Sequence, residues 1–181
     1  MNVSLTHIKN WRRFENLVED YFKEINNPIT KYPSILKVKT FPSGIGADKG
    51  KDVVVTFSVG NPIDEFEVTW VIQCKFHKRT IGLRHLSNVN IPTLLHHFKA
   101  NGYLLICKND ITDELSDFFK TLNRDCKMGY KYLFWRGSDF ETRLESLGTN
   151  CPVMKKYFSR YCNYVDVKEA TSKLLVKQAE E

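Results

Sequence analysis

The sequence predicts an α/β fold in which helices flank a mixed central sheet. Three observations predict this fold class. Apolar residues near the N-terminus recur at helical spacing, strand-like runs rich in β-branched residues follow, and a continuous apolar run at 103–107 lies between two helical patterns. A chain of 181 residues is long enough for one domain with a sizeable core, and too short for two full domains.

Composition narrows the classes of protein that fit the chain. Lys and Arg number 27 against 21 Asp and Glu, a net charge of +6 that favours a polyanionic partner. The five cysteines are widely spaced and form no C-x-x-C pair, so we expect no zinc site and a reducing compartment. The N-terminus lacks the apolar region of a signal peptide, and no apolar run has the length of a membrane span. We therefore expect a cytoplasmic protein that does not bind membranes.

The first expected element is a helix over residues 6–25. Its apolar residues recur at three- and four-residue steps and form one buried stripe. Glu15 falls at the edge of this stripe, between the directions of Phe22 and Ile8, so its carboxylate leans inwards. A rim glutamate whose head group reaches water would occupy the same position, and both interpretations stay open. Pro28 ends the helix, because proline disfavours helical geometry in the residue before it.

Three strands are expected next, at residues 35–41, 52–59 and 67–76. A glycine-punctuated loop at 44–50 delivers Asp52 to the start of the second strand. In the third strand, alternation places Gln73 and Lys75 on the same face. A loop that cradles nucleotide phosphates would lead into a helix, whereas this loop leads into a β-branched run at 53–55, so we disfavour a nucleotide site.

The second half of the chain predicts helices and strands in alternation. The expected elements are a helix at 92–100, a strand at 103–107, a helix at 113–125 capped by Thr112, a strand at 130–135 and a short helix that ends at Leu147. We place a domain boundary at 148–150, so that residues 1–147 form the domain. Residues 148–181 are expected to be a helical extension or linker, with helices at 152–161 and 166–178. Trp11, Trp70 and Trp135 fall on expected core faces.

The polar residues of the central stretch suit metal-assisted cleavage of a phosphodiester bond. A divalent cation polarises the phosphate and generates hydroxide, and magnesium prefers oxygen ligands. Asp52 is the natural carboxylate ligand, and Gln73 offers an amide oxygen beside the main-chain carbonyl of Cys74. Lys75 can position the attacking water, help to deprotonate it and stabilise the charge that develops on the phosphate. Glu15 can reach the metal through a water molecule.

At these residues the sequence resembles the Mrr-like branch of the PD-(D/E)xK nuclease superfamily. The G-x-D-x-G-x-D loop of that family reads Gly46-Ala47-Asp48-Lys49-Gly50-Lys51-Asp52 here, and its Q-x-K strand reads Gln73-Cys74-Lys75. The first helix carries Phe14-Glu15 followed by Leu17-Val18, similar to the F-E-x-L/V opening of the family. The expected order of elements over residues 6–147 resembles its α-β-β-β-α-β core.

The resemblance implies a restriction-endonuclease-like fold and a metal-dependent endonuclease that cuts double-stranded DNA and leaves a 5′-phosphate. It implies Asp52, Gln73 and Lys75 as the catalytic set, Glu15 as the helical acid, and Mg²⁺, with Mn²⁺ as a substitute, as the cofactor. Gln73 replaces the glutamate more usual in the superfamily, which removes one metal-binding charge and predicts weak metal affinity. Asp48 either shapes the loop through its own backbone or lines the site, and both interpretations stay open.

Basic residues beside this stretch are candidate contacts to DNA phosphates, with a solvated basic edge as the alternative. They are Lys49, Lys51, His77, Lys78, Arg79 and Arg84. One site cuts one strand, so we expect a dimer or a higher oligomer in the active state. The resemblance also implies an effector domain in prokaryotic defence against foreign DNA, fused to a sensor or NTPase region.

A second hypothesis comes from a different class of protein. The chain would then be a catalytically weak or inactive nuclease-fold module that binds nucleic acid or protein within a larger assembly. Intact Asp52 and Lys75 argue against such decay.

Overall fold

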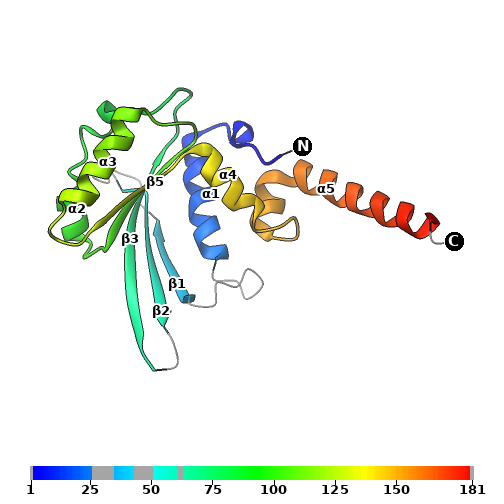
Figure 1. The fold of residues 1–181 in the computed structure, drawn as a ribbon, viewed down its shortest axis with the longest axis horizontal. Coiled ribbons are helices and arrows are strands. Elements are labelled where there is room, and N and C mark those ends of the chain that lie inside the picture. The colour runs from blue at the N-terminus through cyan, green and yellow to red at the C-terminus, as the bar shows by residue number, and fades with distance from the viewer. Residues whose placement is uncertain (1, 26–34, 43–50, 61–62, 180–181) are drawn as a thin grey trace.

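A five-stranded mixed sheet forms the centre of the molecule, with helices on both of its faces (Figure 1). The computed structural model describes residues 2–25, 35–42, 51–60 and 63–179. The strands lie across the sheet in chain order, and they are Ile35–Pro42 (β1), Val53–Gly60 (β2), Glu65–Lys75 (β3), Gly102–Cys107 (β4) and Lys131–Trp135 (β5). The expected α/β class and mixed sheet are confirmed.

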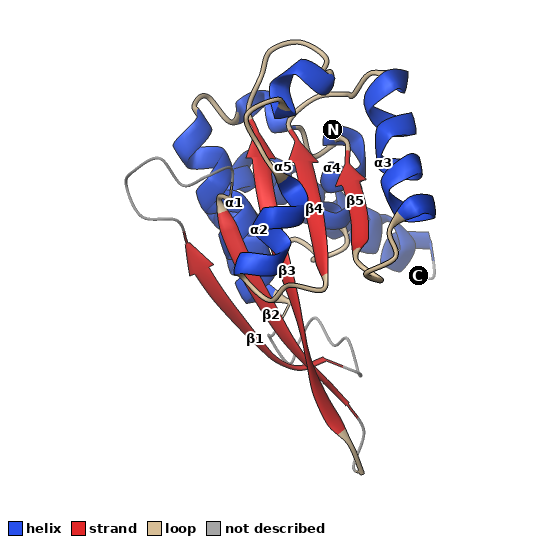
Figure 2. Ribbon diagram, turned by 90° about the vertical axis from the view of Figure 1, so that its left-hand side faces the viewer, coloured by secondary structure: helices blue, strands red, loops and turns tan. Residues whose placement is uncertain are grey.

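The sheet is antiparallel on one side of β3 and parallel on the other. β1, β2 and β3 pair antiparallel, whereas β3, β4 and β5 pair parallel and are connected through helices, as parallel neighbours require. The antiparallel strands extend past the helices at one end of the sheet (Figure 2). β4 is buried along its whole length, which explains its continuous apolar run.

Each face of the sheet has its own core. The helices Trp11–Glu24 (α1), Gly137–Glu145 (α4) and the first part of Pro152–Ala179 (α5) pack on one face, around Phe14, Tyr21 and Phe140. The helices Ile91–His97 (α2) and Asp113–Asp125 (α3), with the 3₁₀ turn Leu83–Leu86 (η2), pack on the other face, around Tyr103 and Phe119. We call these the α1 face and the α3 face.

The first helix begins later than expected. A 3₁₀ turn, Leu5–His7 (η1), comes first, and α1 starts at Trp11 because the Asn10 side chain caps it, accepting a bond of 2.8 Å from the Arg13 N–H. The expectation that Trp11 lies in the core is wrong, since its side chain is 55% exposed. Periodicity puts Trp11 on the buried stripe, but it is the first residue of α1, at the end of the helix. Trp70 and Trp135 are partly buried and pack on the α1 face, as expected.

The C-terminal region, Pro152–Ala179 (α5), contains two helical parts, as expected, but they meet at a kink at Phe158 and not between residues 161 and 166. In α5 the backbone leaves helical geometry at Phe158, with φ −133° and ψ 38°. Before this kink, the Lys156 ammonium and the Tyr157 hydroxyl donate to Asp20 of α1 at 2.6 and 2.8 Å. Met154 and Phe158 are buried in the core of the α1 face, and the later part of α5 extends away from the sheet (Figure 1). None of the helices in the described ranges is both long and apolar enough to cross a membrane. The boundary at 148–150 stays a prediction.

Gly137 opens α4 against the chain that follows β4. A Cβ at this position would overlap the carbonyl oxygen of Lys108, a backbone atom that cannot rotate away. We expect Gly137→Ala to lower the free energy of unfolding by about 1–3 kcal/mol, measured by urea denaturation. Gly82→Ala is the matched control, because its Cβ would meet only Thr112, at an ordinary 3.5 Å. Equal losses in the two variants would contradict the steric explanation.

Candidate active site

Asp52 directly precedes β2, at the end of the sheet where β3 carries Gln73 and Cys74. The antiparallel register pairs Val53 with Ile72, and the Asp52 N–H donates to the Ile72 carbonyl at 2.9 Å, one residue out of that register. The Asp52 carboxylate accepts a hydrogen bond from the backbone N–H of Cys74 through Oδ2. Asp52 is therefore attached to β3 by both its backbone and its side chain, at the point where the loop enters the sheet.

Gln73 points toward the α3 face, where Val71 of the same strand is buried. Its side chain is 4% exposed, and its amide oxygen accepts a hydrogen bond from the buried hydroxyl of Tyr103 on β4. This bond satisfies both polar groups in the core and fixes the orientation of the amide. The sequence analysis missed Tyr103, although a phenol inside an apolar strand signals that its hydroxyl needs a buried partner.

Lys75 lies two residues beyond Gln73, at the last position of β3. It is partly exposed and pairs in register with Cys107 of β4. Burial raises the pKa of the Cys107 thiol to about 12, while the positive charge of Lys75 acts in the opposite direction. The structure thus brings Asp52, Gln73 and Lys75 together at one end of β2 and β3, as the sequence analysis expected of these residues.

Glu15 reaches the same end of the sheet from the α1 face. Burial raises the pKa of the Cys74 thiol well above its usual value, and the negative charges of Asp52 and then Glu15 raise it further. The negative charges of Asp52 and Glu15 therefore both act on the buried Cys74 thiol. Glu15 is partly buried, in agreement with its expected place at the edge of the helical stripe.

The candidate DNA contacts are distributed over several elements. Asp48 and Lys49 lie outside the described residues. Lys51 lies 4.8 Å from the centre of the Phe98 ring, directly after α2. Lys78 and Arg79 are exposed on the chain that leaves β3, and Arg84 is exposed on η2.

His77 forms a pair with His85 of η2. The two ring centres are 4.7 Å apart, and the Asn109 side-chain amide donates to the His77 carbonyl. Burial lowers the pKa of His77, and the neighbouring charges of His85 and Lys75 lower it further. A cationic His77 is therefore disfavoured in this surrounding, which weakens its role as a charged phosphate contact near neutral pH. His85 has no place in the sequence analysis, because only the turn at η2 brings it to His77.

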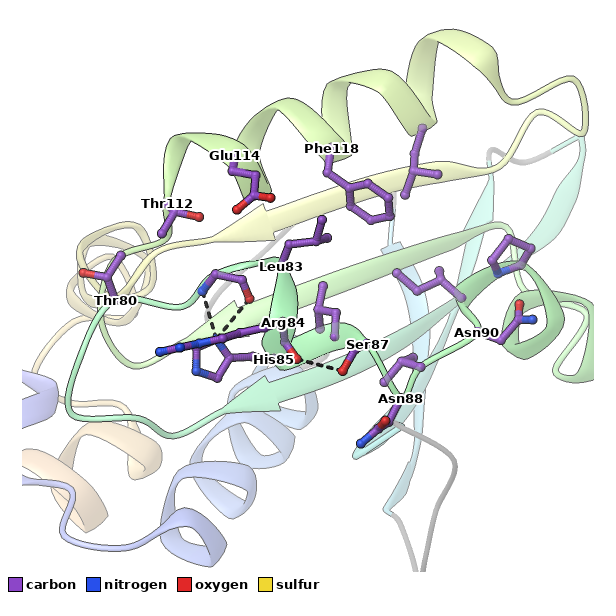
Figure 3. A pocket seen from close by; sticks show the side chains of 16 residues that line it. Thr80, Leu83, Arg84, His85, Ser87, Asn88, Asn90, Thr112, Glu114 and Phe118 are labelled. Carbon is purple, nitrogen blue, oxygen red and sulfur yellow. Dashed lines mark hydrogen bonds between the residues drawn. The ribbon is translucent and has the colours of Figure 1, made fainter.

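A cavity of about 980 Å³ lies between η2 and α3 (Figure 3). Leu83 and Phe118 form part of its apolar wall, and Arg84, His85 and Glu114 add polar groups. Neither Asp52 nor Gln73 nor Lys75 lines this cavity. His85 of its lining contacts His77 on the chain that leaves β3, so the cavity lies beside the site.

The donors at the candidate site suit magnesium better than zinc. Among the described residues, no group of three or more His, Cys, Asp or Glu side chains could hold a metal ion. Asp52 and Glu15 offer two carboxylates, and Gln73 and the Cys74 carbonyl offer neutral oxygens. An all-oxygen set with few protein ligands fits magnesium, which keeps several water molecules.

The Tyr103–Gln73 hydrogen bond predicts a measurable contribution to stability. Tyr103→Phe leaves the Gln73 amide oxygen without its buried donor, so we expect the free energy of unfolding to fall by about 1–3 kcal/mol in urea denaturation. Tyr132→Phe is the control, because the Tyr132 hydroxyl has only a weak contact with the Cys126 sulfur, at 3.6 Å. In a Gln73→Leu background the effect of Tyr103→Phe should shrink. An unchanged effect there would show that the two residues do not act together.

Comparisons with known proteins agree with this geometry. A family model described as a restriction endonuclease, the Mrr catalytic domain, matches residues 8–128, more than half of the chain. No curated protein sequence matches the chain. The solved structure of the MspJI restriction endonuclease in complex with a 27-mer oligonucleotide is similar, with a TM-score of 0.51 and 13% identity over 87% of this chain and 31% of that one.

A second similar structure is the DNA modification-dependent restriction endonuclease AspBHI, with a TM-score of 0.49 and 13% identity over 93% of this chain and 43% of that one. The chain therefore spans less than half the length of either protein. Sequence identity of 13% to these structures supports similarity of the fold alone. The match to the family model, in contrast, covers the first helix, the glycine loop and the β3 motif. The expected family is confirmed: the chain belongs to the restriction endonuclease family and is a restriction-endonuclease-like nuclease domain.

Proposed function

We propose that the chain is a metal-dependent endonuclease that hydrolyses phosphodiester bonds in double-stranded DNA. The observation that carries this proposal is that Asp52 is hydrogen-bonded to the end of β3 on both sides of Gln73, to Ile72 and Cys74, with Lys75 on the same face of β3 as Gln73. Membership of the restriction endonuclease family supports DNA as the substrate. MspJI, whose fold is similar, was solved with a bound oligonucleotide.

Each residue of the candidate site has its own role in the proposed cleavage of the phosphodiester bond. A magnesium ion, which manganese can replace, supplies polarisation of the phosphate and a more acidic water when bound. Asp52, the Gln73 amide oxygen and the Cys74 carbonyl are the groups that would hold it, with Glu15 contributing through water. Lys75 orients the attacking water, accepts or shares its proton, and stabilises the negative charge that develops on the phosphate oxygens. The protein positions these groups before the substrate arrives.

The biological setting is part of the same proposal. A duplex has two strands and each subunit has one site, so the active form contains two or more copies of the domain. The domain acts in the cytoplasm as an effector of prokaryotic defence against foreign DNA, within a protein that also carries a sensor or NTPase region. Asp48, if it lines the site, adds a further carboxylate from the glycine loop.

Substitution of the central residues tests the catalytic assignment. We expect Asp52→Ala and Lys75→Ala each to slow plasmid nicking with magnesium or manganese by at least about 100-fold, because each removes a group that stabilises the transition state. Lys155→Ala, an exposed lysine of α5, is the control and should cleave as the wild type does. Thermal unfolding checks that the variants are folded. Undiminished cleavage by the Asp52 and Lys75 variants would overturn the proposal. A folded, oligomeric wild type that never cuts DNA would favour the inactive binding module.

The metal requirement should depend on residue 73. Gln73→Glu adds a negative ligand charge, so we expect half-maximal cleavage at a magnesium concentration several-fold lower than in the wild type. Gln73→Leu removes the oxygen and should shift the requirement in the opposite direction. The measurement is a magnesium titration of the initial cleavage rate, with Gln73→Asn as a control for side-chain length. If all three variants share the metal dependence of the wild type, Gln73 is not a ligand.

A further inference from the structure

Three lysines from separate parts of the chain meet beyond the end of β3, on the α1 face. Lys108 follows β4, and its ammonium group donates to the Ile8 carbonyl at 3.0 Å and lies 4.3 Å from the centre of the Phe76 ring. Lys9 is the neighbour of Ile8, and Lys78 comes two residues after Phe76. The charges of Lys9 and Lys78 both act on Lys108, and we call these three residues the lysine cluster.

The lysine cluster has no acidic partner among the described residues. None of the ion pairs between them includes any of its three members. Burial lowers the pKa of Lys108, and the like charges of Lys9 and Lys78 lower it further. Repulsion between like charges destabilises the folded protein when no ligand is bound, and a bound anion would offset this repulsion.

The lysine cluster borders the candidate active site. The Lys108 N–H donates to the Lys75 carbonyl at 3.0 Å, and the Phe76 ring packs on Phe14 of α1, with 6.0 Å between the ring centres. The first turn of α1 adds more positive charge. It carries no acidic residue and exposes Arg12, against the usual preference at the positive end of a helix dipole.

The spread of the charges favours an extended anion over a small one. Lys9 precedes α1, Lys78 follows β3 and Lys108 follows β4, so the three ammonium groups belong to three separate segments of the chain. Lysine offers a point charge without the planar fork that reads a base edge. Such contacts set the position of a nucleic acid and its affinity, and they carry no sequence information.

We propose that the lysine cluster binds the sugar-phosphate backbone of duplex DNA on the α1 side of the bond that is cut. This inference rests on the proposed nuclease function and adds Lys9 and Lys108 to the DNA-contacting residues. The bound strand runs past the ends of β4 and β3 to reach Lys75. Sequence preference, if the domain has any, comes from other residues.

The salt dependence of DNA binding tests the proposal. The full wild-type chain binds a short fluorescent duplex in EDTA, and anisotropy gives the affinity over a range of potassium chloride concentrations. Each lost phosphate contact should reduce the slope of log K against log salt by about one and weaken binding at about 0.1 M salt by roughly five- to tenfold. We expect this change for Lys9→Ala and for Lys78→Ala, and about twice the change in slope for the double variant.

Lys108 needs a gentler substitution, because its stem packs on Phe76. Lys108→Met keeps an apolar chain of similar length and removes the charge, and it should show the same loss of slope. Lys155→Ala on α5 and Lys131→Ala on β5 are the controls, since both lysines are exposed and lie outside the lysine cluster. Thermal unfolding checks each variant. If Lys108→Met is unstable, the Lys9 and Lys78 variants decide the matter.

Several outcomes would overturn the inference. The first is that the wild-type chain does not bind the duplex at low salt. The second is that the lysine-cluster variants keep the wild-type slope, and the third is that the control variants lose as much slope as the lysine-cluster variants. Tighter binding of single-stranded RNA of the same sequence would overturn the assignment to duplex DNA. Cleavage assays with Asp52→Ala separate this result from the proposed function. Lysine-cluster variants that bind normally, beside an Asp52→Ala variant that no longer cuts, would reject the present inference alone.

Discussion

The pairing of β2 with β3 is the interaction on which the rest of the candidate site depends. It holds Asp52 beside the end of β3, where the Asp52 N–H donates to the Ile72 carbonyl and the Asp52 carboxylate accepts a hydrogen bond from the Cys74 N–H. Because side chains alternate along a strand, a slip of one residue would turn Gln73 and Lys75 to the α1 face. The burial of Val53 and Val55 on one face and Val54 on the other holds the register.

The mixed sheet determines which segments can contribute to the site. Parallel pairing of β3 with β4 places their carboxyl ends side by side, so the residues after both strands meet there. Antiparallel pairing brings the start of β2 to the same edge. Two strand ends and one strand start therefore supply side chains from positions far apart in the sequence. The helix α1 adds Glu15 from the opposite face of the sheet.

Local patterns predicted most of the fold and where the candidate residues lie on the sheet. Alternation placed Gln73 and Lys75 together, and helical periodicity placed Glu15 at a rim, because both depend on backbone geometry alone. Tyr103 and Lys108 were missed because their partners, Gln73 and Ile8, are distant in the sequence. Trp11 was misplaced because periodicity does not show that α1 begins at this residue, where the Asn10 side chain caps the helix by accepting a hydrogen bond from the Arg13 N–H.

The burial of Cys74 has a consequence for the redox chemistry of the site. Cys74 lies between Gln73 and Lys75, two residues of the candidate site, where oxidation would add bulk and polarity in the core. Oxidants and alkylating agents attack the thiolate, and burial beside the charges of Asp52 and Glu15 favours the protonated thiol. The carboxylates of the candidate site thus make the Cys74 sulfur less reactive.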